Sequence, residues 1–344
     1  MKVLVTGANG FVGNALIPEL IAEGHEVFAL TRTPHKNKKT EKVHWLTGNL
    51  LEPQALPDLP KIDFTYYLVH GMKGEDARFE YEEASAAVNF INWIRPTGTS
   101  IIYLGGLGDP SAKLSPHLRS RHLTGAIFGS SGLPVTEFRA SIVLGEGSLS
   151  FEMIKAIAER IPFRPELSLL NQLCQPLALQ DLLHYLVEAL DLKKNGHEII
   201  EIGGPDAVPY GDLIDMYSEL AGLKRKRIKI PEVESRVLLK ALDYAIPEHS
   251  QIGRKLTESL IFPTVVKSDT AAKFFPDIKP LDARVAMDMA RSSSKTHYAP
   301  LWEKDFLKTL LSDKILTQSG LLSPDLLKNL ERVGKLKDIL SRKS

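Results

Sequence analysis

A histidine and an arginine lie four residues apart in the segment LSPHLRSRHLTG at positions 114–125. On a helix, His117 and Arg121 share one face. An imidazole exchanges protons near neutral pH, and the fork of a guanidinium binds oxygen atoms through paired N–H groups. The pair is therefore a candidate for proton transfer beside a bound ligand. In the alternative interpretation, Ser115 caps the helix and His117, Arg119 and Arg121 face solvent or an ion pair.

The first motif of the chain predicts which ligand that is. Gly7, Gly10 and Gly13 occur in VLVTGANGFVGNAL, directly after a predicted strand and at the start of a predicted helix. In such a turn one glycine makes the bend, one lets a pyrophosphate approach the backbone, and one allows close helix–strand packing. The free N–H groups at the helix start then bind the phosphates. This context favours dinucleotide binding over a glycine-rich turn without a ligand.

The end of the second predicted strand indicates which dinucleotide is bound. An NAD site usually places a carboxylate there, about 20 residues beyond the glycines, but this chain has none between Glu26 and Glu41. Basic and hydroxyl side chains cluster there instead: Thr31, Arg32, Thr33, His35 and Lys36. A guanidinium matches a 2′-phosphate, and a threonine hydroxyl can add a further hydrogen bond. The segment favours NADP over NAD, with a basic surface loop as the alternative.

The elements around these residues alternate between short apolar runs and longer amphipathic ones. Strands are expected at 2–6, 26–30, 43–46, 64–69, 100–104 and 134–138, and helices at 11–23, 76–94 and 117–130. Because a helix is the usual connection between parallel strands, this order predicts a doubly wound, Rossmann-type parallel α/β sheet. After about residue 145 the rhythm changes. Helices are expected at 150–160 and 181–190, a strand is expected in HEIIEIGGP, and mostly helix is expected from 232 onward.

This pattern divides the chain into three parts. Residues 1–148 are expected to form the NAD(P)-binding domain, and residues 149–295 a smaller α/β substrate domain with some segments returning to the first. Residues 296–344 are expected to form a helical tail, with Ser323 as an N-cap and a leucine-rich face that could pack on a second subunit or a protein partner. The nicotinamide is expected between the domains, at the carboxyl ends of the strands.

The composition excludes several classes of protein. The 344 residues are 43% hydrophobic and carry a formal net charge of +1, so no global field recruits nucleic acid or a membrane surface. The single cysteine, Cys174, excludes a disulfide framework, favours a reducing compartment, and lies in an apolar run where we expect it to be buried and inert. No apolar run approaches the roughly 18 residues of a membrane span, and we expect a cytoplasmic protein.

With these residues placed, the chain resembles the extended and atypical short-chain dehydrogenases/reductases over about residues 1 to 290. TGANGFVG resembles the TGxxGxxG fingerprint of that family, and GNL at 48–50 resembles its Gly-Asp-Leu, with Asn49 in place of the aspartate that contacts the adenine. VHGM at 69–72 matches the loop after the fourth strand, and Asn89 matches an asparagine of the next helix. Blocks such as YYLVHGM and EIGGPD resemble the NmrA-like and epimerase-like members.

The resemblance implies a set of cofactor contacts on the glycine turn and the strand ends. These are Thr6, Gly7, Asn9, Gly10, Phe11, Val12, Gly13, Thr31, Arg32, Lys36, Asn49, Leu50, Val69, His70, Gly71, Asn89, Leu104 and Gly105. No residue is expected to bind a metal.

The resemblance also implies what is missing. Active members carry Tyr-x-x-x-Lys on this helix and a serine or threonine after the fifth strand, whereas this chain has His117 and Arg121, with Gly105 and Gly106 at the hydroxyl position. Histidine can exchange the proton, and Arg121 can hold the ribose and bias His117 toward its neutral form. His70 and Tyr103 are weaker substitutes. Two functions therefore stay open: an NADP-dependent oxidoreductase or epimerase-like enzyme on an unknown small molecule, or a non-catalytic NADPH-binding redox sensor or assembly protein.

Three other features have two interpretations each. The basic run LKRKRIKI at 223–230 is a charged edge strand or a site for an anionic partner. Arg139 supports the nicotinamide site or pairs with a carboxylate. The apolar side chains of Phe151, Met153 and Ile154 line a substrate pocket or belong to the core.

Overall fold

The computed structural model describes residues 1–34, 42–70, 76–110, 114–161, 163–193, 195–229, 262–295 and 298. The described chain contains two compact units. The first consists of Met1–Leu144, Cys174–Ala207 and Phe262–Ala286, so two later segments return to it, and the second begins at Gly145. The predicted tail at 296–344, apart from Tyr298, lies outside the described residues, as do the predicted contacts His35, Lys36 and Gly71.

A seven-stranded sheet forms the centre of the first unit, in the order β11-β6-β5-β4-β1-β2-β3. Every neighbouring pair in it is parallel. Its strands are β1 (Lys2–Thr6), β2 (Glu26–Thr31), β3 (Val43–Thr47), β4 (Phe64–Tyr67), β5 (Ser100–Gly106), β6 (Val135–Ala140) and β11 (His197–Ile202). The predicted doubly wound parallel sheet is confirmed. The strand order reverses between β1 and β4, which is where sheets of this kind bind their ligands.

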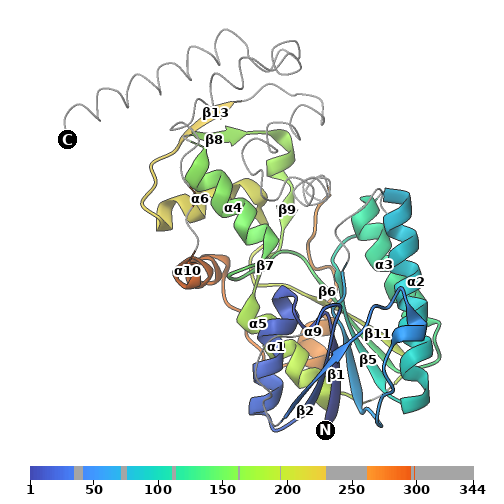
Figure 1. Ribbon diagram of the computed structural model, residues 1–344. Helices are drawn as coiled ribbons and strands as arrows, with labels where there is room; N and C mark the ends of the chain where they lie inside the picture. Colours follow the sequence, from blue (N-terminus) through green and yellow to red (C-terminus); the bar gives the residue numbers. More distant parts are fainter. Residues whose placement is uncertain are drawn as a thin grey trace. The chain divides into compact units, whose positions relative to one another are not determined.

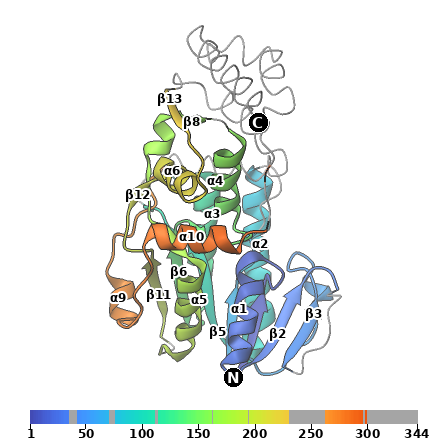
Figure 2. The same ribbon diagram turned by 90° about the vertical axis from the view of Figure 1, so that its left-hand side faces the viewer.

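Alternate residues of the strands bury opposite faces of the sheet. Val3 and Val5 pack with α1 (Phe11–Ala22) and α5 (Leu179–Glu188), whereas Leu4 packs with α2 (Asp76–Ile94). The helix α3 (Pro116–Gly129) lies beside α2 and adds Phe128 to the same core. Figures 1 and 2 show α1 with α5 on one side of the sheet and α2 with α3 on the other.

Two of the predicted strands end at other residues in the structure. The strand expected at 64–69 stops at Tyr67, so Val69 and His70 lie in the connection that follows it. The strand expected to end at 104 continues to Gly106, because Gly105 and Gly106 still pair with residues of β6. This difference places both glycines inside the sheet rather than in a loop.

The second unit is built around α4 (Leu149–Arg160) and α6 (Tyr210–Leu220). Phe151, Met153 and Ile154 are buried in it, and the Phe151 ring packs edge-on against Tyr217, which favours the core interpretation of these side chains. Four residues of the basic run form the strand β13 (Lys226–Lys229), parallel to β8 (Phe163–Glu166).

The remaining elements are short. They are β7 (Val143–Leu144), β9 (Leu173–Cys174), β10 (Leu177–Ala178), β12 (Val208–Pro209), α9 (Thr270–Phe274), α10 (Ala283–Ser293) and the 3₁₀ turns η1 (Pro53–Ala55), η2 (Arg95–Thr97), η3 (Ser168–Asn171) and η4 (Ala189–Asp191). Cys174 is buried, as predicted. Among the described helices, none combines the length and apolar character needed to cross a bilayer.

Candidate cofactor and proton-transfer site

The turn between β1 and α1 requires glycine at two of its three glycine positions. Gly7 has a φ of 67°, and a Cβ atom there would lie 2.6 Å from the carbonyl oxygen of Leu68. A Cβ atom on Gly13 would lie 2.4 Å from the carbonyl oxygen of Gly7. The turn is therefore packed directly against the end of β4 and against its own helix, as the sequence predicts for a dinucleotide fingerprint.

The start of α1 presents backbone N–H groups that no side chain of the N-cap residue caps. Gly10 is its N-cap and has no side chain to cap the helix, while Phe11, Val12 and Gly13 form the first turn. First-turn N–H groups have no acceptor within their own helix, and the helix dipole is positive at that end. No acidic residue lies in this turn. The start of α1 therefore suits the pyrophosphate of a dinucleotide.

Thr6 fastens the turn to the neighbouring strand. Its buried hydroxyl donates to the carbonyl oxygen of Tyr66 at 3.1 Å and accepts the N–H of Leu68 at 3.3 Å. Asn9, in contrast, is exposed at the tip of the turn. Thr6 thus positions the turn through its side chain, and Asn9 is free to face a ligand.

At the end of β2 an arginine is exposed, and the threonine before it makes a hydrogen bond within the chain. The Thr31 hydroxyl donates to the carbonyl oxygen of Thr33 at 2.7 Å, so its proton is already engaged within the chain. Arg32 is exposed. Of Thr31 and Arg32, it is therefore Arg32 that has the side chain available to a 2′-phosphate.

The loop after β3 is held by side chains expected to contact the cofactor. Asn49 accepts the N–H of Leu51 at 3.2 Å and donates to Glu52 at 3.0 Å, so its amide closes a local turn. Asn89 of α2 donates to the carbonyl oxygen of Leu50 at 2.7 Å. Both asparagines thus fix the position of the loop that should border the adenine.

The carboxyl end of β5 is tightly packed at the two glycine positions where the family carries a serine or threonine. A Cβ atom on Gly106 would lie 2.8 Å from Leu118 and 3.1 Å from Arg121, and one on Gly105 would lie 3.3 Å from the carbonyl oxygen of Phe138. The glycines allow α3 to approach the sheet closely. A hydroxyl side chain at Gly106 would require the side chains of Leu118 and Arg121 to shift.

His117 is buried rather than solvated. Ser115 caps α3 by accepting the N–H of Leu118 at 3.2 Å, as predicted, but His117 is only 8% exposed. Its ring packs edge-on against His70, with ring centroids 4.6 Å apart. The solvated-surface interpretation is therefore wrong for His117, while it describes Arg119, whose exposed side chain pairs with Glu80.

Arg121 of α3 and Tyr103 of β5 each donate a hydrogen bond to a backbone carbonyl oxygen of the other's element. A terminal nitrogen of the Arg121 guanidinium donates to the carbonyl oxygen of Leu104. The Tyr103 hydroxyl donates to the carbonyl oxygen of Arg121 at 3.0 Å, and burial raises the pKa of Tyr103 well above its ordinary value. Tyr103 therefore joins β5 to α3, and its high pKa makes it a poor proton donor at neutral pH.

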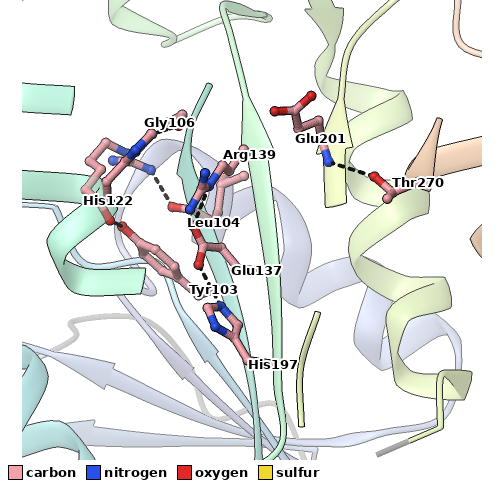
Figure 3. A network of polar contacts seen from close by, with 10 residues as sticks. Tyr103, Leu104, Gly106, His122, Glu137, Arg139, His197, Glu201 and Thr270 are labelled. Carbon is pink, nitrogen blue, oxygen red and sulfur yellow. Dashed lines mark hydrogen bonds and ion pairs between the residues drawn. The ribbon is translucent and has the colours of Figure 1, made fainter. Parts of the chain in front are cut away.

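A buried charged network behind this site was not predicted (Figure 3). Glu137 of β6 is fully buried, and its two carboxylate oxygens accept from Arg139 at 2.6 Å and from His197 of β11 at 2.8 Å. Arg139 thus pairs with a carboxylate, which was the second of its two interpretations. Near it, His122 interacts with the carbonyl oxygen of Gly106 at 3.1 Å.

The surroundings of His122 favour its neutral form. Burial is the largest cause that lowers the pKa of His122, and the positive charge of Arg139 lowers it further. A neutral imidazole can still donate one N–H to the Gly106 carbonyl. No sequence spacing indicates this role, because the partner of His122 comes from β5.

Comparison with known proteins agrees with this geometry. Residues 3–105 match the model of the NAD dependent epimerase/dehydratase family. A 2-alkyl-3-oxoalkanoate reductase of Stenotrophomonas maltophilia is 35% identical over 79 residues, which are 23% of this chain and 20% of the reductase. The chain therefore matches about a fifth of the length of that relative.

Solved structures extend the likeness of the fold to most of the chain. The enzyme WbmH of Bordetella bronchiseptica, in complex with NAD⁺, has a TM-score of 0.62 and 14% identity, covering 85% of this chain and 97% of WbmH. RMD of Pseudomonas aeruginosa, complexed with NADPH, has a TM-score of 0.58 and 14% identity, covering 85% and 99%. These neighbours share the fold and together bind both nicotinamide cofactors. Residues 3–105 are therefore similar to the NAD dependent epimerase/dehydratase family, and the chain shares its fold with WbmH and RMD.

Proposed function

We propose that this protein is an NADP(H)-dependent oxidoreductase in which His117 exchanges the proton that accompanies hydride transfer. The observation that carries the proposal is the burial of His117 against His70. His117 lies at the start of the helix that follows β5, and His70 follows the end of β4. An imidazole held between these two strand ends is near the edge of the sheet where the cofactor binds in this fold.

The protein's own contribution is to orient the substrate and to supply a proton. When bound, NADPH supplies the hydride. For a carbonyl substrate, the N–H bond of the His117 imidazolium breaks as the hydride reaches the carbonyl carbon, and its proton passes to the carbonyl oxygen. The products are an alcohol, a neutral imidazole and the oxidised cofactor NADP⁺. Arg121, fixed by the carbonyl oxygen of Leu104, is assigned to the ribose hydroxyls through its other N–H groups.

The preference for NADP rests on Arg32. It is exposed at the end of β2, and no carboxylate lies between Glu26 and Glu41 to repel a 2′-phosphate or to bind the ribose hydroxyls in its place. The variant Arg32→Ala is expected to weaken NADPH binding much more than NADH binding, measured by nucleotide fluorescence. Equal losses for the two nucleotides would refute the assignment.

The substrate class we propose is a small ketone or the corresponding secondary alcohol. A relative that is 35% identical over 79 residues is named as a reductase of 2-alkyl-3-oxoalkanoates, which carry a ketone. The single buried cysteine fits a reducing compartment, and we propose that the protein acts in the cytoplasm.

A panel assay tests this function. The full chain is mixed with NADPH and a series of 3-oxo acids, simple ketones and nucleotide sugars, and loss of NADPH absorbance is followed. For a substrate that is turned over, His117→Gln is expected to lower kcat by about 10²–10⁴-fold with little change in NADPH affinity. The matched control is His44→Gln, because His44 is an exposed histidine on β3. A His117→Gln variant with full kcat would remove His117 from the mechanism.

The second candidate is a non-catalytic NADPH-binding sensor or assembly protein. The observation that favours it is that β5 ends in Gly105 and Gly106, where the family carries a serine or threonine. NADPH binding without turnover of any compound in the panel would support this candidate.

A further inference from the structure

Two imidazoles and one carboxylate converge from three elements of the first unit. His70 follows β4, Glu83 lies on α2, and His117 lies on α3. The Nδ1 atom of His70 is 3.5 Å from a carboxylate oxygen of Glu83. The rings of His70 and His117 meet edge-on, with centroids 4.6 Å apart and planes at 63°.

This cluster is buried. Glu83 and His117 are each 8% exposed, and Phe79 of α2 packs edge-on against the His70 ring. The charge of Glu83 also acts on the hydroxyl groups of Tyr67 of β4 and Tyr103 of β5, and Arg121 of α3 acts on the same two tyrosines. Burial reduces screening by water, so charges at these distances affect one another strongly.

The cluster does not have the geometry of a metal site. Within the described part of the chain, no group of three histidine, cysteine, aspartate or glutamate side chains could hold a metal ion. Imidazole and carboxylate side chains bind and release protons. Two imidazolium rings this close repel each other, whereas one imidazolium is stabilised by the carboxylate of Glu83.

We propose that Glu83 and His70 are positioning residues for His117, and that the three side chains form one proton-holding unit. The inference rests on the proposed function, because His117 is the group that meets the substrate. Glu83 holds the His70 ring, and the edge of His70 fixes the His117 ring. The negative charge of Glu83 keeps one additional proton on the two imidazoles. Because the two rings are in contact, they bind and release this proton together and not independently.

The variant Glu83→Gln separates this role from simple packing. Glutamine has nearly the same shape as glutamate, but it lacks the charge. The unit then binds its proton less strongly. If the reaction needs the protonated unit, the Glu83→Gln variant loses activity at a lower pH than the wild type as the pH is raised. For a displacement of the pH profile by about one pH unit, the rate on its alkaline side falls about tenfold. Glu83→Asp keeps a charge and should restore part of this rate.

A matched control lies one turn away on the same helix. Glu80 also belongs to α2 and pairs with a charged residue of α3, but its partner is the exposed Arg119. Surface pairs of this kind contribute little. Glu80→Gln is therefore expected to leave both the pH profile and the histidine signals unchanged.

The deciding measurement needs no substrate. Histidine ring-proton NMR signals of the full chain with NADP⁺ are followed against pH and assigned with His70→Gln and His117→Gln. In Glu83→Gln, which is first checked for a cooperative melt, the signals of both rings are expected to move at a lower pH by about one pH unit. His70→Gln, which keeps Glu83, provides the same test should Glu83→Gln fail to fold. It is expected to change the titration of His117.

The outcomes distinguish this inference from the proposed function. Unchanged titration of His117 in both Glu83→Gln and His70→Gln overturns the inference, even where the wild type turns over a carbonyl substrate. Coupled titration without turnover of any compound supports the proton-holding unit and counts against the oxidoreductase.

Discussion

A single methyl group on α3 should break the buried network around Glu137. Gly125 lies in the middle of α3, and a Cβ atom there would lie 2.3 Å from a carboxylate oxygen of Glu137. That carboxylate accepts from Arg139 at 2.6 Å and from His197 at 2.8 Å, so it cannot retreat without lengthening one of these contacts. Gly125→Ala therefore has two opposite effects on stability: a steric clash that destabilises the protein and a higher helix propensity that stabilises it.

The structure decides the sign and size of this effect. Alanine in place of glycine inside a helix stabilises by about 1 kcal/mol. Breaking a buried ion pair costs about 3–5 kcal/mol, because it leaves a charge buried without compensation. The difference is a net loss of about 2–4 kcal/mol in the free energy of unfolding.

A double-mutant cycle measures the effect and its cause. Thermal melts are compared for the wild type, Gly125→Ala, Glu137→Ala and the double variant. With the carboxylate removed, Gly125→Ala should become neutral or stabilising, so the two changes are strongly non-additive. A Gly125→Ala variant that melts higher than the wild type, or one that is equally destabilising in the Glu137→Ala background, would refute the reasoning.

Three further predictions concern the cofactor site. Gly13→Ala should prevent normal NADPH binding, measured by fluorescence titration, because its Cβ would lie 2.4 Å from the carbonyl oxygen of Gly7; wild-type affinity would contradict the close packing. Asn89→Leu leaves the buried carbonyl of Leu50 without its donor and should cost about 1–3 kcal/mol in a melting experiment, whereas a loss below 0.5 kcal/mol, on the order of a neutral surface change, would argue against this role. Because the fold lowers the pKa of His122, the unfolded chain takes up the proton first, and stability should fall as pH drops below about 6.5; His122→Gln should make the dependence of Tm on pH shallower, and an unchanged slope would count against the assignment.

The local part of the cofactor site was predictable from the sequence. The strand, the glycine turn and the helix that follows are consecutive, and their backbone requirements can be recognised from the order of residue types. The same holds for Ser115 as the cap of α3 and for Arg32 at the end of β2. Each of these features depends on neighbours within a few residues along the chain.

The orientation of α3 was not predictable in this way. The spacing of His117 and Arg121 indicates a shared helix face, but it does not indicate which surface that face meets. In the sequence, Gly125 and Gly129 are only weak helix formers. The structure explains why glycine is present at both positions, because Glu137 of β6 and His197 of β11 occupy the space that a side chain would need. His70 and Glu83 gave no signal as partners of His117.

The sequence by itself therefore determined the parallel α/β architecture, the dinucleotide turn and the residue types available at the strand ends, because periodicity and turn chemistry are local properties. Only the tertiary structure decided that His117 is buried beside His70, that Arg121 binds the backbone of β5, and that Glu137 joins Arg139 to His197 across 60 residues of chain. Those contacts depend on how helices pack on the sheet. Packing is set by the shapes and charges of residues far apart in the chain, which no short stretch of sequence contains.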